Sequence, residues 1–239
     1  APVIVLEGDE YLSSPVDRRP KFHLYQAKIA VISGISWDHI NVFPTFENYV
    51  DQFRIFADRL PADGKLIYCR EDETVAEVAQ SSATQAMKIP YGIPAHRINN
   101  GVTSIIHDGH ETQVKVFGKH NLMNMEAARL VCEQLEVSGA DFYRAISSFK
   151  GASRRLEFLS QNGSTSVYKD FAHSPSKLKA TIDAVKEQFP DRKLIACMEL
   201  HTFSSLNQAF LKEYHGAMEK ADIAMVYFNP NTIANKKLA

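Results

Sequence analysis

Three acidic residues crowd together directly after a short apolar run near the start of the chain. Glu7, Asp9 and Glu10 follow residues 3–6, whose Val-Ile-Val-Leu sequence is typical of a buried strand. Ligands of open parallel sheets gather where the strands end, and Mg²⁺ bound to a phosphate relieves the repulsion between neighbouring carboxylates. The cluster therefore indicates either a magnesium–phosphate site or a solvated acidic turn.

A histidine follows a second apolar run. Residues 29–33 predict a strand, and Asp38 and His39 come shortly after it. An imidazole in this position could bind a metal ion, although a hydrogen-bonded structural histidine is the more common occurrence. We expect the neighbouring Trp37 to pack against other side chains rather than to stack on a substrate.

Two asparagines lie three residues apart at the start of a predicted helix. Asn121 and Asn124 follow His120 and therefore share one face of that helix. An asparagine amide offers both a donor and an acceptor, which suits the N6/N7 edge of adenine. Helix capping explains one asparagine well and two less well.

Two arginines and a later aspartate complete the candidate residues. Arg154 and Arg155 follow a break in the pattern of elements, where they could close over a phosphate or form salt bridges between domains. Asp170 ends a predicted strand, and a carboxylate in that place often binds ribose hydroxyls. The segment continues with Phe-Ala-His-Ser-Pro, which includes His173.

The elements that position these residues alternate between strands and helices, which predicts an α/β protein with a mainly parallel sheet. An Asp-Gly pair at 108–109 lies between two apolar segments and predicts an antiparallel hairpin. The further strands are expected at residues 65–68, 167–171, 193–198 and 223–228. The helices are expected at residues 45–59, 73–82, 120–135, 140–149, 176–189 and 206–220.

A small-residue segment, Lys-Gly-Ala-Ser at residues 150–153, is the best candidate for a domain boundary. The α/β pattern restarts after it. We therefore expect one domain over residues 1–152 and a second over residues 153–239. Both ends of the chain are expected to be truncated, because an apolar run begins at once and the last residues close no element.

Composition excludes several classes of function. The 239 residues carry a net charge of -1, which gives no electrostatic case for binding nucleic acid or an anionic membrane. No apolar run approaches the roughly 20 residues that span a bilayer. Cys69, Cys132 and Cys197 have no zinc-like or disulfide-like spacing, so we expect reduced thiols in a cytoplasmic protein.

In order and spacing, these motifs together resemble the Mur ligases, which build the peptide stem of bacterial cell-wall precursors. Glu-x-Asp-Glu, Asp-His, Gly-x-His-Asn-x-x-Asn, Arg-Arg and Asp-Phe-Ala-His-x-Pro follow one another over nearly the whole chain. The resemblance implies part of a central ATPase domain and a Rossmann-like C-terminal domain. It also implies ATP and Mg²⁺ as cofactors, and an acyl phosphate as the intermediate of amide-bond formation.

The resemblance assigns roles to individual residues. Glu7 and His39 match magnesium ligands, and Arg155 matches an arginine that reaches the γ-phosphate of ATP. The other matched residues are His120, Asn121 and Asn124 for adenine, Asp170 for ribose, and His173, His201 and Thr202 for substrate, with the last two in a loop near the incoming amine.

Within the family, residues 17–22 (Asp-Arg-Arg-Pro-Lys-Phe) most resemble the murein peptide ligases. Those enzymes join UDP-N-acetylmuramate to L-alanyl-γ-D-glutamyl-meso-diaminopimelate. The alternatives are a UDP-N-acetylmuramate–L-alanine ligase, a ligase similar to folylpolyglutamate synthase, and a nucleotide-binding module without catalysis.

Three departures from the family pattern stand out. The phosphate-binding loop Gly-x-x-x-x-Gly-Lys is absent from the sequence, so we expect this chain alone to be inactive. Ser33-Gly34 replaces the usual Thr-Asn, and Lys169 and Ser174 stand where an acidic residue and a second histidine are common. These changes weaken any assignment of the substrate and leave the predicted fold intact.

Overall fold

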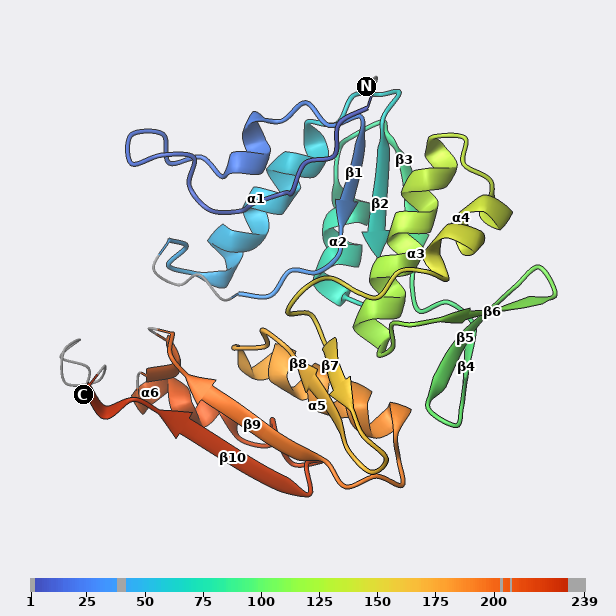
Figure 1. Ribbon diagram of the computed structural model, residues 1–239. Coiled ribbons are helices and arrows are strands. Elements are labelled where there is room, and N and C mark those ends of the chain that lie inside the picture. Colours follow the sequence, from blue (N-terminus) through green and yellow to red (C-terminus); the bar gives the residue numbers. More distant parts are fainter. Residues whose placement is uncertain (1–2, 38–41, 203, 207, 232–239) are drawn as a thin grey trace. The chain divides into compact units, whose positions relative to one another are not determined.

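Figure 1 shows the computed structural model, which describes residues 3–37, 42–202, 204–206 and 208–231. The chain is a mixed α/β protein with two compact units, one of residues 1–93 and 123–139 and one of residues 94–122 and 140–239. The predicted domain boundary divides the sequence at one point, between residues 152 and 153, whereas the two units are grouped by spatial contacts. The boundary therefore stays a prediction. No helix in the described part is long and apolar enough to cross a membrane.

A three-stranded parallel sheet forms the centre of the first unit. Its order is β1 (Ile29–Ile32), β2 (Lys65–Cys69) and β3 (Met87–Tyr91). β2 is the central strand, and four of its five residues are buried. The strands are parallel, so their carboxyl ends lie at one edge of the sheet, where ligands bind in such folds.

Three helices pack against this sheet: α1 (Phe46–Asp58), α2 (Glu73–Ser81) and α3 (Lys119–Gln134), of which α3 begins in the second unit. The first two start at side-chain caps. The Thr45 hydroxyl accepts the backbone N–H of Asn48 at 3.1 Å, and an Asp72 carboxylate oxygen accepts that of Val75 at 3.0 Å. These caps explain why both helices begin where the sequence predicts.

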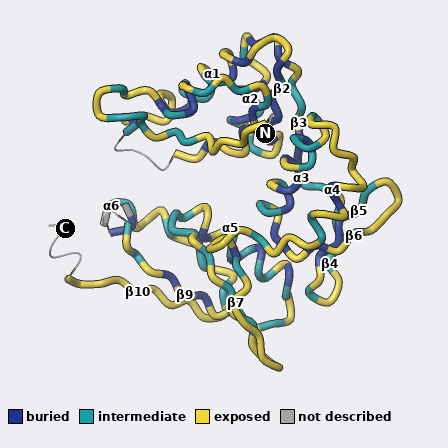
Figure 2. The backbone as a smooth tube through the Cα atoms, turned by 45° about the horizontal axis from the view of Figure 1, so that its top comes forward, coloured by how far each residue is buried: buried dark blue, intermediate teal, exposed yellow. Residues whose placement is uncertain are grey.

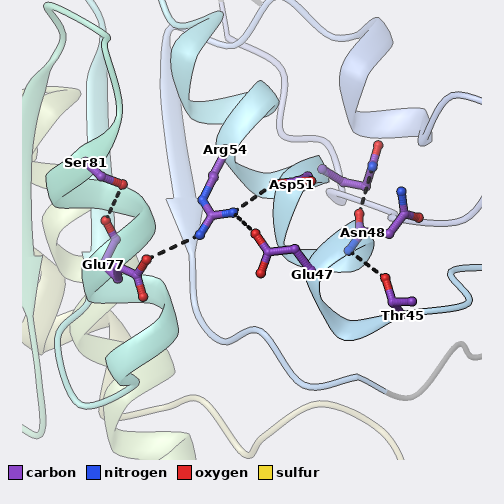
Figure 3. A network of polar contacts seen from close by, with 8 residues as sticks. Thr45, Glu47, Asn48, Asp51, Arg54, Glu77 and Ser81 are labelled. Carbon is purple, nitrogen blue, oxygen red and sulfur yellow. Dashed lines mark hydrogen bonds and ion pairs between the residues drawn. The ribbon is translucent and has the colours of Figure 1, made fainter.

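Arg54 ties α1 to α2 on the surface of the first unit (Figure 3). Its guanidinium contacts Glu47 at 2.7 Å and Asp51 at 2.8 Å on its own helix, and Glu77 of α2 at 3.3 Å. The hydrogen bonds that Arg54 donates to the carboxylates of Glu47 and Asp51, that to Glu47 first, raise the pKa of Arg54. One arginine therefore contacts three acidic side chains and links the two helices at the surface.

The second unit contains an antiparallel sheet of β4 (His96–Asn99), β5 (Val102–His107) and β6 (His110–Val114). Asp108 and Gly109 connect the last two strands with φ angles of 45° and 76°. Two successive positive φ angles are typical of the tight turn that suits a two-residue hairpin. The predicted hairpin is confirmed.

The rest of the second unit holds a hairpin, a parallel strand pair and several helices. The two parallel strands, β9 (Ile195–Leu200) and β10 (Ile223–Phe228), are in register, and all six residues of β10 are exposed (Figure 2). The other elements are β7 (Glu157–Gln161), β8 (Ser166–Lys169), α4 (Gly139–Ile146), α5 (Pro175–Gln188), α6 (Gln208–Leu211), and the 3₁₀ helices η2 (Ser204–Leu206) and η3 (Lys212–Tyr214). A further 3₁₀ helix, η1 (Lys21–Leu24), belongs to the first unit.

Two predicted elements are wrong. Residues 3–6 form no strand and are exposed, with Val5 at 87%. The apolar run shows a need for burial, but a strand also needs a hydrogen-bonding neighbour, and these residues pair with no described strand. The predicted helix over residues 206–220 is divided into short helical turns, and Gly216 in its last part has a left-handed φ of 76°.

Candidate active site

Asp170 organises the candidate site of the second unit. It follows β8, and both carboxylate oxygens accept backbone N–H groups, those of Leu156 and Ala172, each at 2.6 Å. The first bond reaches back 14 residues along the chain to the segment of the two arginines. Asp170 therefore links the backbone directly after Arg155 to its own loop.

The backbone around Arg155 is strained. Arg154 and Leu156 have φ angles of 59° and 49°, which residues with a Cβ rarely adopt. Each such residue costs on the order of 1 kcal/mol and persists where its surroundings enforce it. Here the carboxylates of Asp170 and Glu157 accept the N–H groups of Leu156 and Arg154, the latter at 2.8 Å.

This backbone leaves the Arg155 side chain exposed. Its guanidinium carbon lies 5.7 Å from the ring centroid of Phe171, within the range of a cation–π contact. Neither Arg154 nor Arg155 forms a salt bridge with any residue that the structure describes, so the salt-bridge alternative finds no support there. The Arg155 guanidinium keeps its donors for an anion.

Two histidines surround the same ring. The imidazole of His173 lies 5.0 Å from the Phe171 ring, that of His201 lies 6.3 Å from it, and the two imidazoles are 6.4 Å apart. Tyr214 of η3 donates its hydroxyl hydrogen to the backbone carbonyl of His173 and anchors that loop. The structure thus brings Arg155, His173 and His201 together around one aromatic side chain.

The predicted adenine-binding residues lie at the start of α3. Burial lowers the pKa of His120, and the nearby charge of Asp170 partly offsets this, so the imidazole is neutral at neutral pH. Asn121 donates its amide N–H to the carbonyl of Phe117 at 2.9 Å, which uses one of its donors. Asn124 is exposed and its amide is open to a ligand. Adenine binding stays a prediction.

The predicted magnesium ligands are placed only in part. Glu7 is exposed in an irregular segment, and His39 lies outside the described residues. No group of three metal-binding side chains gathers in the described ranges. A magnesium site in a phosphate-transfer enzyme needs only one or two carboxylates beside the substrate phosphates and water, and the exposed Glu7 fits that requirement.

Thr202 has a local structural role. Its hydroxyl accepts the backbone N–H of Ser205 at 3.1 Å, and its own N–H donates to the Ser205 hydroxyl at 3.0 Å. These reciprocal bonds close the turn that leads into η2. The prediction that Thr202 binds substrate stays untested.

Sequence reasoning missed two residues of this site. Phe171 stands inside the Asp-Phe-Ala-His motif, and its position between two candidate residues could have drawn attention to it. Tyr214 lies 41 residues after His173, and no pattern in the sequence connects the two.

Comparison with known proteins gives two family matches. The Mur ligase middle domain matches residues 4–132, and the Mur ligase glutamate ligase domain matches residues 154–239. A UDP-N-acetylmuramate–L-alanine ligase of Paenarthrobacter aurescens is 31% identical over 94% of this chain and 50% of its own length. That of Desulfitobacterium hafniense is 28% identical over 98% and 56%.

Solved structures share the fold at lower identity. The UDP-N-acetylmuramate–alanine ligase of Thermotoga maritima has a TM-score of 0.64 and 17% identity, over 90% of this chain and 51% of its own. The murein peptide ligase of Psychrobacter arcticus has a TM-score of 0.56 and 18% identity, over 96% and 55%. The chain spans about half the length of the curated relatives it matches. The middle-domain match alone covers more than half of its residues, and the chain belongs to the Mur ligase family.

Proposed function

We propose that this chain is the ATP-handling and amine-binding part of an amide ligase that acts on UDP-N-acetylmuramate. The observation that carries the proposal is the arrangement around Phe171. An exposed guanidinium that pairs with no described carboxylate, and is suited to a phosphate, contacts the same ring as two imidazoles suited to an amine. Family membership supplies the reaction class, and the names of the relatives supply the sugar nucleotide.

In this reaction ATP phosphorylates the muramate carboxylate, and the amine then displaces phosphate from the resulting acyl phosphate. Arg155 would neutralise charge on the transferring group, while Asp170 keeps its backbone in place. Asn121 and Asn124 would bind adenine. Magnesium, held by Glu7 and His39, would supply further neutralisation of phosphate charge.

Two amines are candidates, each favoured by one observation. The resemblance of residues 17–22 to murein peptide ligases favours the tripeptide L-alanyl-γ-D-glutamyl-meso-diaminopimelate. The names of the curated relatives favour L-alanine. Folylpolyglutamate synthase shares the fold at 15% identity, which says nothing of the acceptor of this chain.

A competition assay tests the proposal. The full-length protein receives ATP, Mg²⁺ and UDP-N-acetylmuramate with equal concentrations of tripeptide and L-alanine, and the two products are separated by mass. We expect ADP release to depend on the sugar nucleotide, and one amine to dominate the product. ADP release that ignores UDP-N-acetylmuramate, or that requires a folate, would contradict the proposal.

A further inference from the structure

Two aromatic side chains of the first unit stay half-exposed near the carboxyl edge of its parallel sheet. Trp37 stands shortly after β1 and is 39% exposed, and Phe46, the first residue of α1, is 40% exposed. Their ring centroids lie 6.4 Å apart. Trp37 thus packs against another side chain, as the sequence predicts, but much of this aromatic pair remains open to a ligand.

Hydrogen bonds hold the Trp37 segment at this edge of the sheet. The backbone N–H of Ile35 donates to a carboxylate oxygen of Asp72 at 3.0 Å, and Asp72 stands shortly after the end of β2. The indole N–H of Trp37 donates to the backbone carbonyl of Phe43 at 3.0 Å, which limits how far the ring can turn. Because ligands of parallel sheets bind at the carboxyl ends of the strands, the indole is held near the ligand-binding edge.

Two buried aromatic residues join this pair to the acidic segment of the chain. Phe43 and Tyr49 are buried, and their ring centroids lie 5.2 Å apart. The Tyr49 hydroxyl donates to a carboxylate oxygen of Glu10 at 3.4 Å. Glu10 belongs to the same acidic segment as Glu7, the predicted magnesium ligand. The half-exposed pair therefore lies on an aromatic cluster that contacts the segment proposed for phosphoryl transfer.

The chemistry of the proposed substrate decides which of its parts fits these rings. In UDP-N-acetylmuramate a lactyl group attached to the sugar carries the reacting carboxylate. The pyranose ring is therefore the nearest large neighbour of that carboxylate, and the uracil lies beyond the diphosphate. A pyranose ring has an apolar face of C–H groups that stacks on aromatic side chains, while its polar groups stay at its edge. The sugar thus matches an aromatic pair that adjoins the acidic segment.

We propose that Trp37 and Phe46 form a platform that binds the pyranose ring of N-acetylmuramate. The inference rests on the proposed ligase function and adds the residues that hold the sugar of its first substrate. Both side chains act by binding and orientation, because neither carries a group that titrates. The platform would direct the lactyl carboxylate of the bound sugar toward the acidic segment of Glu7.

Separate measurements with UDP-N-acetylmuramate and with UDP distinguish the sugar contact from the nucleotide contacts. Both affinities are measured by calorimetry on the full-length protein, in the presence of a non-hydrolysable ATP analogue. Trp37→Ala and Phe46→Ala should each weaken binding of UDP-N-acetylmuramate by about 5- to 10-fold, and that of UDP by less than about 2-fold. Trp37→Phe keeps an aromatic ring and loses the N–H bond to Phe43, so it should weaken binding of the sugar nucleotide by less than about 3-fold.

Phe158→Ala is the matched control, because Phe158 is a half-exposed aromatic residue of the second unit. It should leave both affinities unchanged, and the affinity for the ATP analogue should keep its wild-type value in every variant. If either Trp37→Ala or Phe46→Ala binds UDP-N-acetylmuramate like the wild type, the two rings form no platform and the inference is wrong.

Two further results would overturn the inference. An equal loss of UDP affinity would mean that the rings hold the nucleotide rather than the sugar. A loss in Trp37→Phe as large as that in Trp37→Ala would assign the effect to the bond with Phe43 rather than to stacking. If the wild-type protein does not bind UDP-N-acetylmuramate at all, the ligase proposal itself fails, and the inference fails with it.

Discussion

The carboxylate of Asp170 accepts the backbone N–H of Leu156 at 2.6 Å, across 14 residues of sequence. Together with the bond from the Arg154 N–H to Glu157, this bond supports a segment around Arg155 that has two positive φ angles. An aspartate predicted to bind ribose thus has a structural task as well. A carboxylate has about four lone-pair sites, so the two backbone bonds leave acceptors for a ligand.

Asp170→Ala should loosen this segment locally. Hydrogen bonds to charged groups contribute about 1.5–3 kcal/mol, so amide hydrogen exchange at Leu156 should accelerate by roughly 10- to 100-fold. Asp222→Ala is the matched control, because Asp222 accepts the N–H of Leu194 at 2.7 Å. That variant should accelerate exchange at Leu194 and not at Leu156. Unchanged protection of Leu156 in Asp170→Ala would show that the carboxylate does not hold the backbone.

His23 should make the first unit sensitive to acid. It is buried, its Nε2–H donates to the Gln52 carbonyl at 2.8 Å, and burial lowers its pKa below the usual 6.5. The unfolded chain therefore binds the proton more readily, so stability is present above about pH 6.5 and is lost as the pH falls below that value. Trp37, the single tryptophan, lies in the first unit and reports its unfolding by fluorescence.

The urea midpoint followed through Trp37 should fall between pH 7.5 and 5.5 in the wild type, and should fall less in His23→Gln. Glutamine keeps a donor near the position of Nε2 and removes the titration. His215→Gln, in the other unit, should keep the wild-type pH dependence. If the urea midpoint falls equally in His23→Gln and in the wild type, His23 is not the cause of the acid sensitivity.

Thr103 and Gln188 form a buried polar pair in the second unit. The Thr103 hydroxyl donates to Oε1 of Gln188 at 2.8 Å, and Nε2 of Gln188 donates to the Gly101 carbonyl at 2.7 Å. Thr103→Val keeps the shape and leaves the Gln188 acceptor unpaired, which should lower the free energy of unfolding by about 1–3 kcal/mol. Thr103→Ser keeps the hydroxyl and should cost less in thermal denaturation. Equal melting temperatures for both variants would contradict this role.

The sequence predicts the regular elements well where local signals and packing agree. The helices predicted from residues 45 and 73 and the turn at Asp108-Gly109 are all found, and bonds within a few residues hold the start of each helix. β3 escaped prediction because Pro90 and polar residues interrupt its apolar pattern. The strand predicted over residues 3–6 is wrong for the opposite reason, because a strong apolar pattern does not show whether another strand lies beside it.

The residues of the candidate site were likewise predictable where a local motif marks them. Arg155, Asp170 and His173 belong to motifs that are visible in the sequence, and the structure brings them together with His201. The Phe171 ring that joins them could be suspected from its motif. The anchor from Tyr214 and the positions of the two imidazoles depend on contacts with backbone carbonyls, which leave no trace in residue types.

Transfer of carboxylate oxygen to phosphate tests the central claim most directly. UDP-N-acetylmuramate labelled with heavy oxygen in its carboxylate is incubated with the full-length protein, ATP, Mg²⁺ and the preferred amine, and the released phosphate is analysed by mass spectrometry. An acyl phosphate intermediate predicts that every phosphate released carries one oxygen from the sugar nucleotide. Product formation with unlabelled phosphate would contradict the claim that the protein is a ligase of this kind.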